Sequence, residues 1–395
     1  MKRFFSYIIL SFFLLLLPTG QASANNNDSI RLSLLTCAPG EEIYSLFGHT
    51  AIRYENPSQG IDVVFNYGLF SFNTPNFIFR FSLGETDYQL GATDYERFAA
   101  EYAFFGRSVW QQTLNLTDEE KTELIRLLQE NYRPENRVYR YNFFYDNCAT
   151  RPRDKIEESI AGKVIYPAEP QDGSLTFRDI VHQYCKGHPW ARFGIDLCIG
   201  SEADQPITQR QMMFAPFYLM DAFDGAQIKS DSIQRPLITA NELVVDATPE
   251  PDESGWMPTP LQCTLLLFIL TTAATIYGIR RRTGLWGIDL FLFGIAGIVG
   301  CVLAFLALFS QHPAVNSNFL LLVFHPGQLL FLPYIIYCVR KGKKCWYLTL
   351  NLAALTLFIV LFPVIPQRFD FAVVPLALVL LIRSASNLIV TSKKK

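Results

Sequence analysis

The stretch SLFGHTAIR at residues 45–53 decides the fold, together with YDNCAT at residues 145–150. The first places His49 at the start of a predicted strand. The second places Cys148 between a predicted strand, residues 138–144, and a predicted helix that runs from near Cys148 to residue 160. A thiol and an imidazole are the nucleophile and base of thiol enzymes. The two stretches therefore predict an α+β domain with a thiol site.

The flanking sequence fits a mixed domain. Residues 30–35, 51–54 and 61–66 carry the β-branched and aromatic residues of strands, and turn residues separate them. TDEE at residues 117–120 is a capping box before a helix with leucines on one face. Further helices are predicted after Thr176 and over residues 208–223. We expect the exported domain to span residues 25–223 and a connector to span residues 224–258.

The N-terminus resembles a secretory signal. Lys2 and Arg3 precede an apolar run over residues 4–18, and Ala-Ser-Ala at residues 22–24 is a cleavage signature. We expect a signal peptide over residues 1–24, with an uncleaved anchor as the alternative. Both export the residues that follow. The net charge of −2 argues against a nucleic-acid partner.

Five apolar segments predict a transmembrane domain over residues 259–395. They are residues 261–279, 288–310, 319–339, 345–364 and 371–388. The third contains His325-Pro326-Gly327 and is expected to be kinked or discontinuous. The fifth is the weakest candidate, because Arg383 falls near its end.

Loop charges give the orientation of this domain. Lys and Arg gather at residues 280–282, 340–344 and 393–395, whereas the loops at 311–318 and 366–370 hold only Arg368. Positive loops stay in the cytoplasm. The sequence therefore predicts a multi-pass protein of the bacterial inner membrane, with residues 25–258 in the periplasm. His312 and His325 are expected either to hydrogen-bond between helices or to contact a lipid headgroup.

A reactive cysteine needs a lowered pKa, which a helix N-terminus and an imidazole can supply. Asn147 is a candidate N-cap, with Thr150 as an alternative helix start. A hairpin that pairs residue 54 with residue 61 would place Asn66 opposite His49, where it could orient the ring. A two-residue slip would bring Gly68 opposite His49 instead, and Asp62 is the fallback.

Each of these residues could also have a purely structural role. A lone cysteine is more often a small buried hydrophobe than a nucleophile, and a strand histidine is often only a satisfied polar group. Cys37 is a rival nucleophile. Cys185 and Cys198 either form a disulfide in the periplasm or stay free. Arg151 and Arg153 beside Cys148 are either ion-paired helix residues or a phosphate clamp. No cofactor or metal is expected, since the histidines near Cys185 lack ligand spacing.

The order of histidine strand, polar strand and Asn-Cys at a helix start resembles the circularly permuted papain-like fold, as in permuted NlpC-like enzymes. More closely, PGEEIYSLFGHTA at residues 39–51, FNYG at 65–68 and YNFFYDNCATR at 141–151 resemble the periplasmic domain of the Lnb-type lipoprotein N-acyltransferases of the Bacteroidota. A five-helix transmembrane domain also fits that family. The resemblance covers nearly the whole mature chain.

The resemblance implies acyl transfer from a phospholipid, through a Cys148 thioester, to the α-amine of a diacylated lipoprotein. His49 would move the protons, and Tyr44 or Ser45 could join backbone N–H groups in stabilising the oxyanion. Two alternatives stay open. One is an envelope thiol peptidase, amidase or lipid hydrolase of the permuted NlpC-like class, and the other is a non-catalytic envelope sensor. The sequence does not indicate an oligomeric state.

Overall fold

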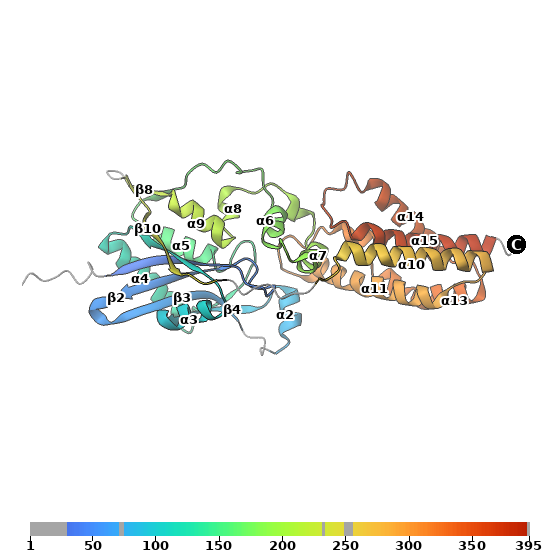
Figure 1. Cartoon of the computed structure of the whole chain (residues 1–395), viewed down its shortest axis with the longest axis horizontal. Coiled ribbons are helices and arrows are strands. Elements are labelled where there is room, and N and C mark those ends of the chain that lie inside the picture. Colours follow the sequence, from blue (N-terminus) through green and yellow to red (C-terminus); the bar gives the residue numbers. More distant parts are fainter. Residues whose placement is uncertain (1–29, 71–74, 231–233, 249–255, 393–395) are drawn as a thin grey trace, which may run out of the picture.

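The computed structural model describes residues 30–70, 75–230, 234–248 and 256–392. A domain built on a β-sheet and a helical bundle lie end to end along the long axis (Figure 1). The chain is thus a mixed α+β domain followed by a helical domain, as predicted. The expected signal peptide lies outside the described residues.

Seven strands form one antiparallel sheet in the order β10-β5-β1-β2-β3-β4-β6. Each neighbouring pair runs antiparallel, and β1 and β2 are paired over their whole facing length. The strands are β1 (Arg31–Cys37), β2 (His49–Asn56), β3 (Ile61–Leu69), β4 (Asp87–Asp94), β5 (Val109–Leu114), β6 (Val138–Arg140) and β10 (Ile238–Val245).

Helices cover both faces of this sheet, because successive strand residues point to opposite sides. Leu35 faces α3 (Tyr95–Phe104), whose Phe98 and Tyr102 belong to the same buried cluster. Leu34 belongs to the larger cluster on the other face, under three helices. These are α4 (Asp118–Tyr132), α5 (Thr150–Ser159) and α9 (Pro216–Asp224). The predicted capping box of α4 is confirmed, with a Thr117 N–H to Glu120 bond of 2.8 Å.

The predicted strand over residues 138–144 and the predicted connector differ from the structure. The strand expected over residues 138–144 ends at Arg140, because the Asn142 side-chain oxygen accepts the N–H groups of Phe144 and Tyr145 and turns the chain. The expected connector, residues 224–258, contains β10, which closes one sheet edge against β5. It also holds β8 (Gln227–Lys229) and β9 (Gln234–Pro236), which pair with β7 (Lys163–Ile165) in a small sheet.

The remaining segments of this domain are short. The predicted helix over residues 208–223 is broken into α8 (Gln209–Met212) and α9, since Pro216 starts a new helix. The other elements are α2 (Phe77–Leu83), α6 (Phe177–Tyr184), α7 (Pro189–Cys198), η1 (Pro57–Gln59) and η2 (Ser201–Asp204).

Three helices in the described part of the chain are long and apolar enough to cross a membrane. They are α10 (Pro260–Arg281), α11 (Trp286–Phe309) and α15 (Val373–Ser392). The third predicted span is broken, as expected, with a 74° bend between the segment 319–330 and α13 (Leu332–Lys341). That segment contains η3 (Phe319–Leu322) and α12 (Gly327–Leu330). The fourth, α14 (Trp346–Leu361), is apolar but has only 16 residues, so five full spans are not established.

The fifth predicted span, the weakest candidate by sequence, is a helix long and apolar enough to cross a membrane. Arg383 lies in the middle of α15 and forms two bonds, of 2.7 and 3.0 Å, with Asp289 of α11. Its third nitrogen donates to Thr275 of α10 at 3.0 Å. Both charged side chains are 2% exposed. An arginine in a span is tolerated when it faces the bundle interior and is paired, so Arg383 joins three helices instead of ending one.

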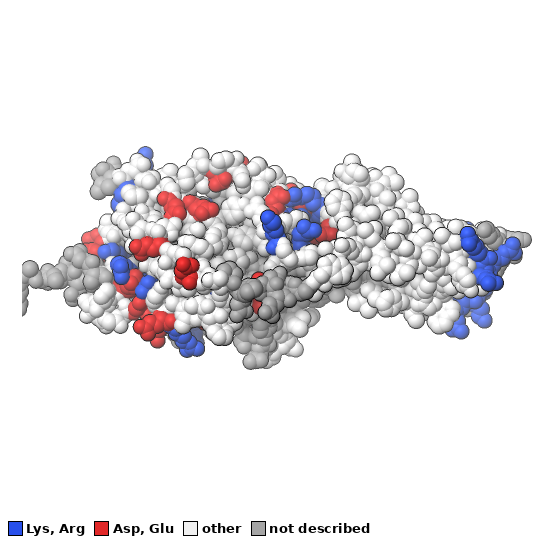
Figure 2. Space-filling view, viewed as in Figure 1, with Lys and Arg blue, Asp and Glu red and all other residues white. Residues whose placement is uncertain are grey.

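Charge divides the bundle into two ends. Figure 2 shows Lys and Arg gathered at the end remote from the sheet domain, where α10 and α13 finish in Arg280, Arg281, Arg340 and Lys341. At the opposite end, the loop at residues 311–318 and the loop at 366–370 contact the sheet domain. The Gln311 N–H donates to Leu83 O at 2.8 Å, and Arg368 binds Asp179 at 2.6 Å. The positive loops and the sheet domain therefore lie on opposite sides of the membrane.

Candidate active site

The thiol and the imidazole come together at one end of the sheet. β1 ends at Cys37, which pairs with His49 at the start of β2. β4 begins at Asp87, which pairs with Arg140 at the end of β6, and the chain then continues into the turn before Cys148. This is the end of the sheet that faces the helical bundle (Figure 1).

The hairpin between β2 and β3 has a shorter turn than predicted. Asn56 pairs with Ile61, since η1 and a left-handed Gly60 complete the turn, and Asn66 pairs with Ala51. The predicted pairing of Asn66 with His49 is therefore wrong by two residues. Asn66 still reaches the ring diagonally, with its side-chain oxygen 2.5 Å from His49 Nε2. The fallback residue, Asp62, is held by Arg53 at 2.7 and 2.8 Å.

This contact fixes which nitrogen of His49 carries the proton. An amide oxygen can only accept a hydrogen bond, so Nε2 must donate. In the neutral ring the lone pair is then on Nδ1, the nitrogen that does not face Asn66. A neutral His49 can therefore accept a proton at Nδ1.

Gly68 lies close to both reactive side chains. A Cβ atom added to Gly68 would lie 3.6 Å from Cys148 Cβ and 3.9 Å from His49 Cε1. The φ angle of Gly68 is 89°, which L-residues with side chains rarely adopt. Glycine at this position thus leaves the space between thiol and imidazole open.

Cys148 lies just before a helix start. α5 begins at Thr150, the alternative start, and its N-cap is Ala149 and not the predicted Asn147. The Asn147 side-chain oxygen accepts the N–H groups of Ala149 and Thr150, at 2.8 and 2.9 Å, in the turn just before the helix. The amide of Asn147 donates to Phe143 O and Phe214 O. Asn147 thus has a full set of internal bonds and holds the turn that carries Cys148.

Both reactive groups are uncharged at neutral pH. Burial raises the pKa of the Cys148 thiol to about 11, against hydrogen bonds from the backbone of Thr50 and of Cys148 itself. Burial lowers the pKa of His49 to about 4, opposed by Asn66 and assisted by the charge of Arg107. The prediction of a lowered thiol pKa is wrong, because desolvation outweighs the helix terminus. The site is therefore suited to proton transfer from thiol to imidazole as the sulfur attacks, and not to a resting ion pair.

The two arginines beside Cys148 have internal partners. Arg151 binds Asp146 at 2.6 and 2.7 Å. Arg153 is buried and binds Asp154 and the Arg210 carbonyl, both at 2.9 Å. Both guanidinium groups therefore have the protein partners expected of ion-paired helix residues. A phosphate would have to compete with these partners.

Tyr44 and Ser45 also have partners other than a substrate. The Ser45 hydroxyl donates to Glu42 O at 2.9 Å. The Tyr44 ring packs edge-on against Phe70, with its centroid 6.2 Å away. Neither contact aims a donor at Cys148.

Tyr139 is a site residue that sequence reasoning missed. Its hydroxyl oxygen would lie 4.0 Å from a Cβ atom on Gly68, beside Cys148 and His49. It is buried and has no hydrogen-bond partner among the described residues. The Arg151 guanidinium stacks on the ring at 3.5 Å and fixes it in place. A buried, unpaired donor beside a nucleophile is the group that an oxyanion site requires.

The other exported cysteines are unsuited to the role. Cys185 and Cys198 are free thiols, so the possible disulfide between them is not present. Cys185 is the C-cap of α6 and Cys198 is the last residue of α7. Cys37 is buried and hydrogen-bonded to Tyr102, and burial raises its pKa to about 12.

The two bundle histidines bind protein groups. His312 Nε2 donates to Phe81 O at 2.7 Å and so ties α2 to the end of α11. His325 lies 3.3 Å from the Asn351 side-chain oxygen inside the bundle. Of the two alternatives, hydrogen bonding within the protein describes both contacts.

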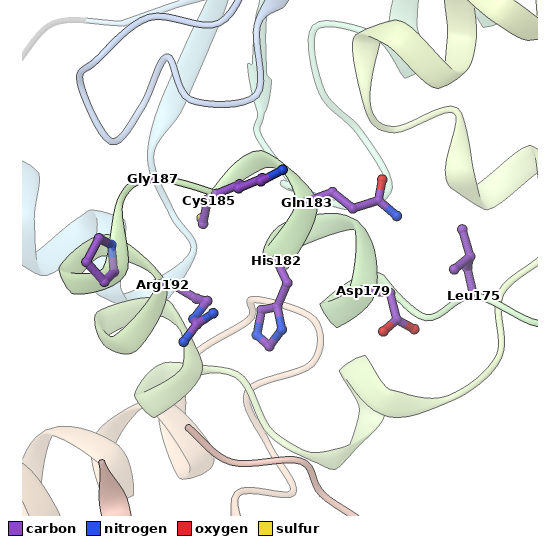
Figure 3. Close-up of a pocket in the computed structure, with 9 residues that line it drawn as sticks. Leu175, Asp179, His182, Gln183, Cys185, Gly187 and Arg192 are labelled. Carbon is purple, nitrogen blue, oxygen red and sulfur yellow. The ribbon is translucent and has the colours of Figure 1, made fainter. Parts of the chain in front are cut away.

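A pocket of about 440 Å³ lies away from the thiol, between α6 and α7 (Figure 3). Three of its lining residues are paired with groups of the protein: Asp179 with Arg368, His182 with Asp196, and Arg192 with Asp370. The pairs with Arg368 and Asp370 join the sheet domain to the bundle, whereas His182 and Asp196 both belong to the sheet domain. The pocket is therefore part of the domain junction and carries no reactive pair.

Two family profiles match the chain. The profile described as the Lnb N-terminal periplasmic domain matches residues 20–182, and the one described as the Lnb transmembrane domain matches residues 252–395. Together they cover well over half of the chain and include His49, Asn66 and Cys148. No curated protein and no solved structure matches it.

Proposed function

Because the chain belongs to the Lnb family, with a periplasmic domain followed by a transmembrane domain, we propose that it is a lipoprotein N-acyltransferase of the bacterial inner membrane. The donor is a phospholipid, and the acceptor is the α-amine of a diacylglyceryl-cysteine at the N-terminus of a lipoprotein. One observation carries the proposal: Cys148, His49 and Asn66 come together at the sheet end that faces the membrane domain.

The first step acylates the enzyme. His49 Nδ1 takes the thiol proton while Cys148 Sγ attacks the carbonyl carbon of a donor ester. The C–O bond to glycerol breaks, and His49 returns the proton to the departing alcohol. The products are a Cys148 thioester and a lysophospholipid. The raised pKa of the thiol favours this concerted route, since a free thiolate is costly in a buried site.

The second step transfers the acyl chain. The neutral acceptor amine attacks the thioester carbon, and His49 takes a proton from the nitrogen. The C–S bond breaks, the sulfur takes the proton back from His49, and an amide remains on the lipoprotein. Asn66 keeps Nε2 protonated throughout and so leaves Nδ1 available in both steps.

The oxyanion of each step needs donors close to the sulfur. The Tyr139 hydroxyl is unpaired and borders the same open point as Cys148 and His49. The backbone N–H groups of Thr50 and Cys148 are further donors within reach of the Cys148 sulfur. Donors beside a nucleophile are suited to stabilise the oxyanion of an acyl-transfer step.

Reconstitution tests the function directly. The full-length protein in vesicles should convert a labelled phospholipid and a diacylated lipopeptide into a lysophospholipid and a triacylated lipopeptide, with an acyl mass added to Cys148 when the lipopeptide is omitted. Free fatty acid as the sole acyl product would support a lipid hydrolase. Cleavage of cell-wall peptides without acylation of Cys148 would support a peptidase.

Removing the Tyr139 hydroxyl should slow acylation without removing the nucleophile. Loss of one oxyanion donor lowers kcat by about 10²-fold or more, so we expect Tyr139→Phe to form the thioester about 10²-fold more slowly, as followed by intact-protein mass spectrometry. The matched control is Tyr67→Phe, whose buried hydroxyl donates to Asn131 and not to the site. Equal rates for Tyr139→Phe and the wild type would exclude Tyr139 as a donor.

A further inference from the structure

A row of aromatic rings runs from the region of Cys148 to α2. The ring centroids of Tyr141 and Tyr88 are 4.2 Å apart, and those of Tyr88 and Phe70 are 5.0 Å apart. Phe70 stacks on Phe77 at 5.7 Å, and Phe77 on Phe81 at 6.1 Å. The five rings are therefore linked by successive contacts from Tyr141 to Phe81.

The inner end of the row lies at the thiol. Tyr141 and Cys148 pack against the same buried cluster, which contains Tyr88. Tyr88 also pairs across the sheet with Tyr139, whose hydroxyl borders the open point at Gly68. Burial, together with the neighbouring Cys148, raises the pKa of Tyr88 to about 12. An acyl group on Cys148 would thus start beside Tyr88 and Tyr141.

The outer end of the row lies against the outer end of a membrane span. Phe79 of α2 packs on Phe305 of α11 at 5.8 Å, and Gln311 and His312 after α11 bond to the backbone of α2. Figure 1 shows α2 on the bundle side of the sheet domain.

The apolar residues of α2, beside the end of α11, are exposed. Ile78 is 80% exposed and Phe79 is 57% exposed. Exposed apolar side chains that adjoin a membrane span are suited to contact with lipid. Phe81, the last ring of the row, is also 45% exposed and so opens toward the same surface.

We propose that this row, Tyr141, Tyr88, Phe70, Phe77 and Phe81, binds the acyl chain that the enzyme transfers, with its methyl end toward α2 and the outer leaflet. The proposal rests on the proposed function, since it assigns a place to the chain of the Cys148 thioester. The fit is chemical: a saturated chain needs an apolar surface continuous with both its donor membrane and the reacting sulfur. The row links the buried rings beside Cys148 to the exposed Phe81 of α2.

Photo-cross-linking of the thioester tests the position of the chain. The full-length protein in vesicles is loaded from a phospholipid whose acyl chain carries a diazirine either close to the ester or at the methyl end. After illumination, peptide mass spectrometry should place the first label on Tyr88 or Phe70 and the second on Phe77 or Phe81. Labels from an acylated Cys148 on residues outside the row would overturn this proposal and leave the proposed function standing. Absence of any Cys148 thioester would remove both.

Chain-length selectivity gives a second measurement. Phe77→Ala should lower kcat/KM about tenfold for a donor with sixteen-carbon chains and leave a donor with six-carbon chains nearly unchanged, because the short chain does not extend to Phe77. Phe104→Ala is the matched control, since Phe104 is an exposed phenylalanine that makes no ring contact with the row. An equal loss for both donors in Phe77→Ala, or the same selectivity change in Phe104→Ala, would contradict the assignment.

Discussion

Replacing Cys148 with alanine should abolish triacylation of lipoproteins in a strain that carries this variant as its sole copy. The thioester cannot form without the sulfur, and loss of a nucleophile costs on the order of 10⁴-fold or more in kcat. The fold should survive, because Cys148 is partly accessible and the turn that carries it is held by Asn147 and Thr150. Mass spectrometry of lipoprotein N-terminal peptides measures the outcome, which should be diacyl forms only.

Cys198→Ser is the matched control for this variant. Cys198 is a free and partly accessible thiol on the same exported part of the chain, but it lies on α7 at the domain junction. We expect normal triacyl peptides from it. Triacyl peptides from the Cys148→Ala strain would remove Cys148 as the acyl carrier.

The second large effect is expected from His49→Ala, which should lower the rate of thioester formation by about 10²- to 10⁴-fold. Burial keeps the thiol protonated at neutral pH, so a base must take its proton as the bond forms. The membrane level of the protein should not change. His188→Ala is the control, since His188 lies outside the site and only approaches Glu41, at 3.8 Å. Asn66→Ala should form the thioester more slowly than the wild type but faster than His49→Ala, because this change removes only the group that orients the imidazole ring.

The acid limb of the wild-type rate checks the same base. The pKa of His49 is lowered to about 4, so Nδ1 keeps its lone pair until the pH falls to that range. Thioester formation should therefore stay near its maximum at about pH 5.5, where an ordinary histidine of pKa about 6.5 would be mostly protonated. An acid limb with a midpoint at or above pH 6.5 would contradict a buried, neutral His49.

Most of the correct predictions from sequence depend on interactions between residues that are close together in the chain. The helix after Thr117 follows from its capping box, and the interruption between η3 and α12 follows from proline and glycine in an apolar run. The contact of His49 with Asn66 was predicted for a different reason. A two-residue slip leaves both side chains on one face of the sheet, so the register was wrong while the contact survived.

Predictions that depended on distant partners failed. β10 reads as a weak strand until β5 supplies its hydrogen bonds, so residues 224–258 looked like a connector. The pKa of Cys148 depends on burial by several segments, and no sequence motif reports that burial. Tyr139 has no distinguishing neighbour in sequence. Only the fold brings its hydroxyl beside Gly68.

The ion pair between Asp289 and Arg383 has a consequence for how the protein is made. The two residues are 94 positions apart, so α11 leaves the ribosome well before its partner on α15. Asp289 is in the first turn of α11, near the helix end, where a charge costs less than at the centre of a span. The contact that joins α10, α11 and α15 therefore forms only after the last helix has been made. A chain truncated before Arg383 would lack this contact and leave Asp289 without its partner.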